Sequence, residues 1–379
     1  MVNIIDKKRN TGIELLKVIA IFLIVISHVT QTLGEQNVIV QLTNPIIQGV
    51  AKSDFSEVVT IFFRHLGGIG NTIFIVCSAY FLLNSKEVKK EKVVKMVLIN
   101  FSVSVIILMI TLLLGFNISI KNILTSFFPT LKTLNWFVTC YILFYMIHGY
   151  LNNIIENCSK KKHLAICMFL ITFYYILNIA FFANNFFYTK ICDFITIYFI
   201  VAYLKKYCKN FMCSNKINIS LVTIGILVLI TNHFLSNYLG LKIEFFSNKV
   251  MLISGDVRIY NLFIGIGLLN LFKKIDLQSK IVKNLSSLSL LIYIIHDNIF
   301  VRGIFRPIVW NYIYNITNYK YLVVTTIIYA IILFAISALF AYIYNKIFQN
   351  ILDSITNKII IFSKKVFEKI YNISNKLLN

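Results

Sequence analysis

Two ionisable side chains, Lys17 and His28, stand out within the first apolar segment, IELLKVIAIFLIVISHV. They are eleven positions apart, so an α-helix would place both on one face, separated by about 16 Å along its axis. Ionisable groups at membrane depth are costly and usually face a protein interior or a wet cavity. A neutral imidazole accepts protons near neutral pH. His28 is therefore a candidate general base, and the segment is a candidate wall of a functional pocket.

A second histidine, His296, lies within the apolar stretch LLIYIIHDN. A role as proton relay or substrate contact and a structural hydrogen bond are both open for it. Ser78 in FIVCSAYFLL has neither a neighbouring histidine nor a nucleophile-elbow pattern, so we interpret it as a helix-packing residue.

The remaining histidines are weaker candidates. We expect His65 and His148 near the membrane interface, and His163 and His233 exposed. His163 and Cys167 could share a metal at their spacing of four, but a structural role is more typical of so small a set, and no metal is expected.

The composition predicts helices that position these residues in a membrane. The chain has 379 residues, of which 58% are hydrophobic and only 14% charged, well below the quarter typical of soluble domains. Long, continuously apolar runs exclude a β-barrel. We predict an all-α polytopic membrane protein with about ten spans, near residues 13–33, 64–83, 94–115, 134–151, 164–183, 188–204, 217–237, 254–272, 285–301 and 321–345.

The basic residues predict how the helices are oriented. Of the 37 Lys and Arg residues, 25 fall on one side of the predicted membrane and 11 on the other. The positive-inside rule then places both termini in the cytoplasm. The net charge of +22 does not indicate a nucleic-acid partner, since the cations are scattered at helix ends.

The chain divides into a transmembrane domain over residues 1–347 and a tail over 348–379. Apolar side chains recur every three or four residues in the tail, with Lys between them, which is typical of an amphipathic helix on anionic lipid. A helix that binds a partner protein is the alternative.

Four separated motifs together resemble the membrane-bound acyltransferase 3 family, and especially its stand-alone members that O-acylate surface polysaccharides. The motifs span almost the whole chain in the family's order: RNTGIELLKVIAIFLIVISHV, IFIVCSAYFLL, LNWFVTCYILFYMI and SLSLLIYIIHD. Four positions differ from the family's usual residues. Lys17 stands for Arg, Lys92 and Lys95 replace a pair of Arg, and Ala79 replaces Gly, so the bidentate guanidinium fork is lost.

The resemblance implies transfer of an acyl group, most often acetyl, from coenzyme A to a hydroxyl of a bacterial surface or capsular polysaccharide or its lipid-linked precursor. No permanently bound cofactor is implied, and acyl-CoA would be a co-substrate. The implied place is the bacterial plasma membrane, among membrane lipids and possible polysaccharide-assembly proteins.

The implied site has three parts. His28 and His296 would be catalytic. Arg9, Lys17, Lys92 and Lys95 would bind the donor's phosphates, although all four could instead be cytoplasmic anchors, and Glu14 could pair with Lys17. Trp136 and Arg64 would contact the acceptor or anchor the outer interface.

Two other function classes fit the same residues. A transporter or flippase of polysaccharide assembly could line its path with Lys17, His28 and His296, although helices broken by Gly or Pro and internal repeats are not evident. An inactive scaffold of an assembly complex is the third possibility. Binding of acyl-CoA would separate the acyltransferase from the transporter.

Overall fold

The computed structural model describes residues 10–85, 87–176, 190–247 and 259–378 and is helical, with no strand in these ranges. The elements are α1 (Thr11–Thr32), α2 (Phe55–Phe62), α3 (His65–Leu82), α4 (Lys90–Leu113), α5 (Ile120–Ser126), α6 (Trp136–Asn157), α7 (Lys160–Ile171), η1 (Thr172–Ile176), α9 (Lys190–Tyr207), α10 (Lys209–Cys213), α11 (Asn215–Lys242), α12 (Glu244–Ser247), α13 (Ile259–Phe272), α14 (Lys280–Ser287), α15 (Ser289–His296), η3 (Val301–Phe305), α16 (Arg306–Thr317) and α17 (Leu322–Leu378). The prediction of an all-α polytopic membrane protein is confirmed.

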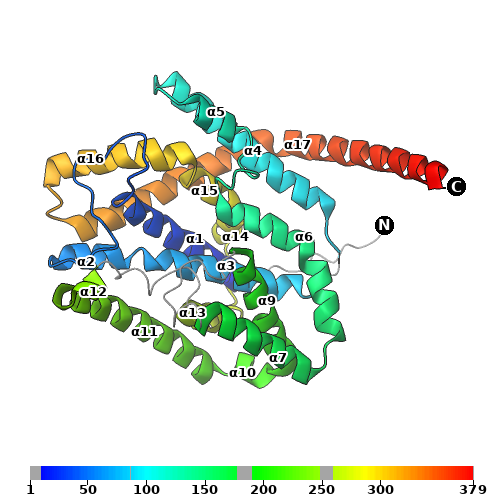
Figure 1. The fold of residues 1–379 in the computed structure, drawn as a ribbon, viewed down its shortest axis with the longest axis horizontal. Helices are drawn as coiled ribbons and strands as arrows, with labels where there is room; N and C mark the ends of the chain where they lie inside the picture. The colour runs from blue at the N-terminus through cyan, green and yellow to red at the C-terminus, as the bar shows by residue number, and fades with distance from the viewer. Residues whose placement is uncertain (1–9, 86, 177–189, 248–258, 379) are drawn as a thin grey trace.

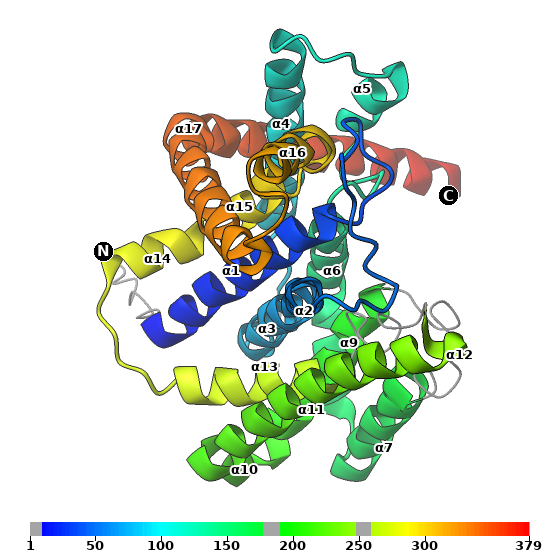
Figure 2. The ribbon, with the colours of Figure 1, turned by 90° about the vertical axis from the view of Figure 1, so that its left-hand side faces the viewer.

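Helix α1 lies at the centre of the bundle, surrounded by α3, α13, α15 and α17 (Figures 1 and 2). Asn10 begins it, since its side-chain oxygen accepts a hydrogen bond from the Ile13 amide at 3.0 Å. α1 and α3 pack closely because α3 carries glycines on the shared face. A Cβ at Gly70 would lie 2.5 Å from the Ala20 carbonyl oxygen.

Six described helices are long and apolar enough to cross a membrane: Thr11–Thr32, Phe55–Leu82, Lys90–Leu113, Trp136–Asn157, Asn215–Lys242 and Leu322–Asn375. Ile259–Phe272 is a shorter apolar helix. The span expected over 64–83 begins earlier, because α2 leads directly into α3. The spans expected near 164–183, 188–204 and 254–272 fall partly outside the described residues, and the number ten stays a prediction.

The single helix expected over residues 285–301 is broken. α15 ends at His296, and the π-helical η3 begins at Val301. Between them, the Asn298 side chain accepts a hydrogen bond from the Phe300 amide at 3.0 Å, a local bond that competes with the helical pattern. The predicted span ran through the break because apolar residues resume at Ile299, directly after the polar residues His296, Asp297 and Asn298.

The basic tail is not separated from the last apolar segment by a break in helix. α17 runs through Leu322–Leu378, so the predicted boundary at residue 347 is not marked by a change of secondary structure. The position of the tail on the membrane surface stays a prediction.

Candidate active site

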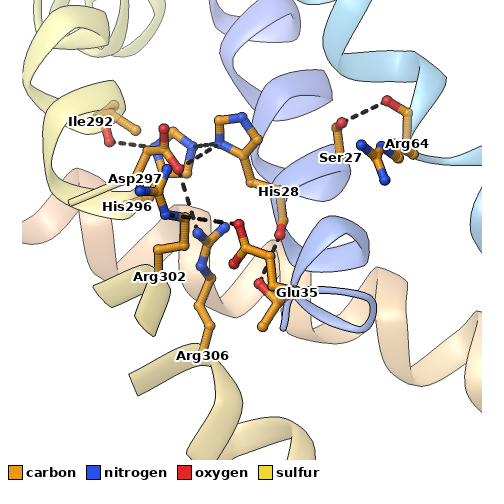
Figure 3. A network of polar contacts seen from close by, with 10 residues as sticks. Ser27, His28, Glu35, Arg64, Ile292, His296, Asp297, Arg302 and Arg306 are labelled. Atoms are coloured by element: carbon orange, nitrogen blue, oxygen red, sulfur yellow. Dashed lines mark hydrogen bonds and ion pairs between the residues drawn. The ribbon is translucent and has the colours of Figure 1, made fainter. Parts of the chain in front are cut away.

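His28 and His296, the two histidines predicted to be catalytic, lie next to each other. His28 extends from the C-terminal part of α1 and His296 ends α15 (Figure 3). His28 Nδ1 is 3.0 Å from His296 Nε2, and the rings stack with centroids 5.1 Å apart. The fold therefore joins two residues that are 268 positions apart in the chain.

The hydrogen bonds assign a tautomer to each ring. His296 Nδ1 lies 2.7 Å from the Ile292 carbonyl oxygen, and a carbonyl only accepts, so Nδ1 donates. In the neutral ring, His296 Nε2 is then an acceptor, and His28 Nδ1 donates to it. The basic lone pair of His28 is consequently on Nε2, the nitrogen that points away from His296 in Figure 3.

The carboxylate of Asp297 completes this centre. Its Oδ1 lies 3.3 Å from His28 Nδ1 and 3.4 Å from Arg306 Nη2. The Asp297 side chain is 5% exposed and that of Arg306 1%, so each charge needs the other to be tolerated at this depth. The carboxylate orients the His28 ring and would stabilise the imidazolium that forms when Nε2 takes a proton.

Exposure separates the roles of the two histidines. The His28 side chain is 12% exposed, whereas His296 is fully buried at 0%. A base must come within hydrogen-bond reach of the proton that it removes. We therefore interpret His28 as the candidate base and His296 as a positioning residue behind it.

The C-terminal end of α1 is fixed by side chains that donate hydrogen bonds to its last carbonyl groups. Trp310 Nε1 donates to the Val29 carbonyl oxygen at 2.9 Å, and the Gln48 amide donates to that of Thr30. Arg64 donates to Gln48 in turn, and its own carbonyl accepts from Ser27 Oγ at 2.7 Å. The last carbonyl groups of a helix have no partner within the helix, and these bonds satisfy them. They also hold in place the last turns of α1, which carry His28.

A second charged group lies on the outer side of His28. Arg302 Nε is 3.8 Å from Glu35 Oε1, in the loop that follows α1. Burial raises the pKa of the Glu35 carboxyl above its usual value, while Arg306 and then Arg302 oppose that rise. The loop is tied to η3 by the Ile39 and Val40 amides, which both donate to the Gly303 carbonyl oxygen at 2.9 and 3.1 Å.

A cavity of about 790 Å³ approaches the centre from the opposite end of α1. Phe74, Phe137 and Tyr293 line its apolar part, and Lys17, Asn84 and Lys92 are among its polar residues. The Tyr293 ring packs edge-on against His28, with centroids 6.1 Å apart. The cavity thus leads from a region with cations toward the candidate base.

Only some of the predicted donor-binding residues line the cavity. Lys17 and Lys92 line the cavity. Lys17 also pairs with Glu14 at 3.2 Å, the alternative that its spacing indicated. Lys95 instead forms an ion pair with Asp353 of α17 at 2.5 Å and is not among the cavity residues. Arg9 lies outside the described residues.

The predicted acceptor-side residues, Arg64 and Trp136, lie in different places. The Arg64 backbone carbonyl accepts a hydrogen bond from Ser27, the residue before His28, whereas the Arg64 guanidinium donates to Gln48. Trp136 does not join the histidine cluster: Lys190 Nζ lies 4.5 Å from its ring centroid, and Phe137 packs edge-on against it. Ser78 lines the cavity as well as packing in α3.

Two expectations for the remaining histidines are wrong. His163 and His233 were expected to be exposed, but they are 0% and 2% exposed. His163 Nε2 donates a hydrogen bond to the Phe199 carbonyl oxygen at 3.0 Å. His233 Nε2 donates to the Val58 carbonyl oxygen at 2.9 Å, so Nδ1 of the neutral His233 ring accepts from His65 Nε2 at 2.9 Å.

His65 and His148 are buried inside the bundle, at 3% and 0% exposed, and their expected place near the membrane interface stays a prediction.

Sequence reasoning missed Asp297, Glu35 and the inward position of Arg306. Asp297 directly follows His296 in a quoted motif, and an acidic residue at the end of an apolar run is itself a signal of function. Arg302 and Arg306 were counted only as outer basic residues, although their spacing of four would have indicated a shared helical face.

The helical bundle of this membrane protein therefore encloses a histidine–carboxylate centre whose groups have the chemistry of proton transfer. The sequence model of the acyltransferase 3 family, described as an acyltransferase domain, matches residues 10–346. The chain belongs to this family and is a membrane acyltransferase by that membership. Neither a curated protein nor a solved structure gave a match to the chain.

Proposed function

We propose that this protein transfers an acyl group, most simply acetyl, from acyl-CoA to a hydroxyl of a bacterial surface or capsular polysaccharide or its lipid-linked precursor. The proposal places it in the plasma membrane with its cavity open to the cytoplasm. Family membership favours this function over a transporter or an inactive scaffold.

The inner cavity supports a donor with phosphates at one end and a thioester at the other. Lys92 Nζ lies 4.3 Å from the Tyr145 ring centroid and donates to the Tyr141 hydroxyl at 3.3 Å, so this cation is held at the cavity. Ammonium groups bind phosphate as point charges. The long arm of coenzyme A would run past Phe137 and Tyr293 and bring its thioester toward His28.

The chemistry then needs one base and good alignment. His28 Nε2 takes the proton of the acceptor hydroxyl as its oxygen attacks the thioester carbonyl. The tetrahedral intermediate collapses, the C–S bond breaks, and the leaving thiolate takes the proton back from the imidazolium. The product is an ester and free coenzyme A, so the base is regenerated. Bringing both substrates together in line supplies much of the rate.

One observation carries this proposal: His28 Nδ1 is held by both His296 Nε2 at 3.0 Å and Asp297 Oδ1 at 3.3 Å. This arrangement leaves Nε2 basic and balances the charge that proton transfer creates.

The test uses purified protein in lipid nanodiscs, acetyl-CoA labelled with ¹³C in the acetyl group, and de-O-acylated surface polysaccharide from the producing strain. NMR of the recovered polysaccharide should show a labelled O-acetyl resonance. If acetyl-CoA neither binds nor donates its label, the proposed reaction is wrong, and uptake of the polysaccharide into sealed vesicles would favour a transporter instead.

A further inference from the structure

The outer side of the His28 centre contains charged atoms that are buried without a hydrogen-bond partner. In the part of the chain that the structure describes, these include Glu35 Oε2 and the Nε and Nη1 atoms of Arg306. A buried polar atom left without a partner costs about 1–3 kcal/mol, and more when it is charged, so such atoms in a native protein need an explanation.

Their chemical types are complementary. Glu35 Oε2 can only accept a hydrogen bond when ionised, and Arg306 Nη1 can only donate. An alcohol hydroxyl does both, since it carries one donor hydrogen and two acceptor lone pairs. Hydroxyl groups on neighbouring carbons could therefore satisfy both residues together, as a hydrocarbon or a simple anion could not.

The position of these atoms matches that of an acceptor. Arg306 Nη2 binds Asp297, and Asp297 contacts His28, so Arg306 connects the unpartnered atoms to the candidate base. Figure 3 shows Glu35, Arg302 and Arg306 on one side of His28. The donor cavity approaches through Tyr293 from the inner end of α1, so the two substrates would meet at His28.

Close packing of the loop after α1 holds Glu35 near Arg302. A Cβ at Gly34 would lie 2.9 Å from the Ile46 carbonyl oxygen and 3.0 Å from Gln48 Cγ, so only glycine lets residues 46–48 pack so closely. Glu35 Oε2 and the Arg306 guanidinium are themselves buried, whereas the Glu35 side chain as a whole is 22% exposed and that of Arg302 33%, so a ligand would enter along the Arg302 rim.

We infer that Glu35 and Arg306, with Arg302 at the rim, form the acceptor subsite and bind hydroxyl groups next to the one that is acylated. The ligand class is a polyhydroxylated sugar with a vicinal diol. This inference rests on the proposed function and adds the recognition residues and the direction of entry.

Glu35→Gln tests the subsite in a side chain that does not touch the catalytic histidines. We expect the KM for de-O-acylated polysaccharide to rise about tenfold, as for loss of one charged hydrogen bond. The donor KM and the melting temperature should stay unchanged, and Glu35→Asp should recover part of the loss. Asp54→Asn is the matched control, because it removes an exposed outer carboxylate that caps α2.

Measuring the binding of the same polysaccharide without acetyl-CoA separates the acceptor subsite from the proposed acyl-transfer reaction. Wild-type protein should bind it, Glu35→Gln should bind it about tenfold more weakly, and polysaccharide whose vicinal diols have been cleaved by periodate should not compete. An unchanged affinity or KM in Glu35→Gln overturns the subsite, even if transfer proceeds. Failure of wild type to bind the polysaccharide overturns it as well, whereas binding without transfer would contradict only the reaction.

Discussion

Asp297 links the two parts of the proposed mechanism at the residue scale, because one of its carboxylate oxygens contacts both His28, the proposed base, and the buried cation of Arg306. Without its charge, the imidazolium formed during transfer would have no counter-ion in a site of low dielectric. The same contacts make Asp297 part of a buried ion pair whose loss is expensive. Its catalytic and structural contributions must therefore be measured separately.

Asp297→Asn should lower kcat by roughly 100-fold or more and change the donor KM little. A factor of about 100 is the lower end of what general-base catalysis contributes. Steady-state kinetics with labelled acetyl-CoA measures both constants. Leaving Arg306 unpaired could cost about 3–5 kcal/mol of stability, so Asp297→Asn/Arg306→Gln serves as the charge-matched variant. A folded variant of either kind that turns over at the wild-type rate would rule out this role.

Lys92 and Lys95 provide a matched pair for the donor site. Lys92 lines the cavity, whereas Lys95 pairs with Asp353. Lys92→Gln should raise the KM for acetyl-CoA about tenfold through loss of a phosphate contact, and Lys95→Gln should leave it unchanged. Equal effects of the two substitutions would contradict the assignment of the cavity to the donor.

At the scale of helices, the site depends on how closely α1 approaches α3 and on the break between α15 and η3. The break lets His296 and Asp297 face α1 from consecutive positions, which a regular helix would direct about 100° apart. π-helical turns such as η3 are frequent at functional sites. The geometry of the centre is thus a property of three elements packed together.

Gly70→Ala should disturb this packing. Its Cβ would lie 2.5 Å from the Ala20 carbonyl oxygen and 2.7 Å from Ile24 Cγ1, so α1 must shift. We expect the free energy of unfolding to fall by about 1–3 kcal/mol. Turnover should fall too, because α1 carries His28. Gly303→Ala is the control, since its nearest neighbour would be 3.7 Å away. Thermal unfolding in detergent compares the two, and equal stability would refute the close-packing argument.

The sequence predicted these elements unevenly, for physical reasons. The helical period was enough to place Lys17 and His28 on one face, and motif order pointed to His296. Asp297, Glu35 and Arg306 were missed because their roles depend on contacts between α1, its following loop and α16, which no local pattern records. His163 was wrongly expected at the surface because Phe199, Tyr203 and Tyr207 enclose it only after folding.

For the whole molecule, the proposed mechanism requires the two substrates to arrive from opposite ends of α1. Lys17 and Lys92 are at the predicted cytoplasmic end, and Glu35 and Arg302 are beyond the other end. This orientation is a prediction from the excess of basic residues on the side of the membrane that holds both termini. A membrane-embedded His28 then lies between a cytoplasmic donor and an acceptor on the outer side.

Cysteine labelling tests this orientation in intact cells and inverted vesicles. In a Cys213→Ser background, which removes the exposed native thiol, Ser85→Cys lines the cavity and Asn318→Cys lies in the turn between α16 and α17. A membrane-impermeant maleimide should label Ser85→Cys only in inverted vesicles and Asn318→Cys only in cells. Acetyl-CoA should slow labelling of Ser85→Cys alone. Labelling of both from one side would contradict the proposed topology.

The central claim is that His28 is the base, and its most direct test is the acyl-transfer kcat of purified His28→Ala. His163→Ala is the matched control, since His163 is another histidine inside the bundle but is bonded to the Phe199 carbonyl group, away from the centre. With both variants folded and His28→Ala still binding acetyl-CoA, we predict a loss of at least about 100-fold for His28→Ala and near wild-type turnover for His163→Ala. Turnover by His28→Ala at half the wild-type rate or more would contradict the claim.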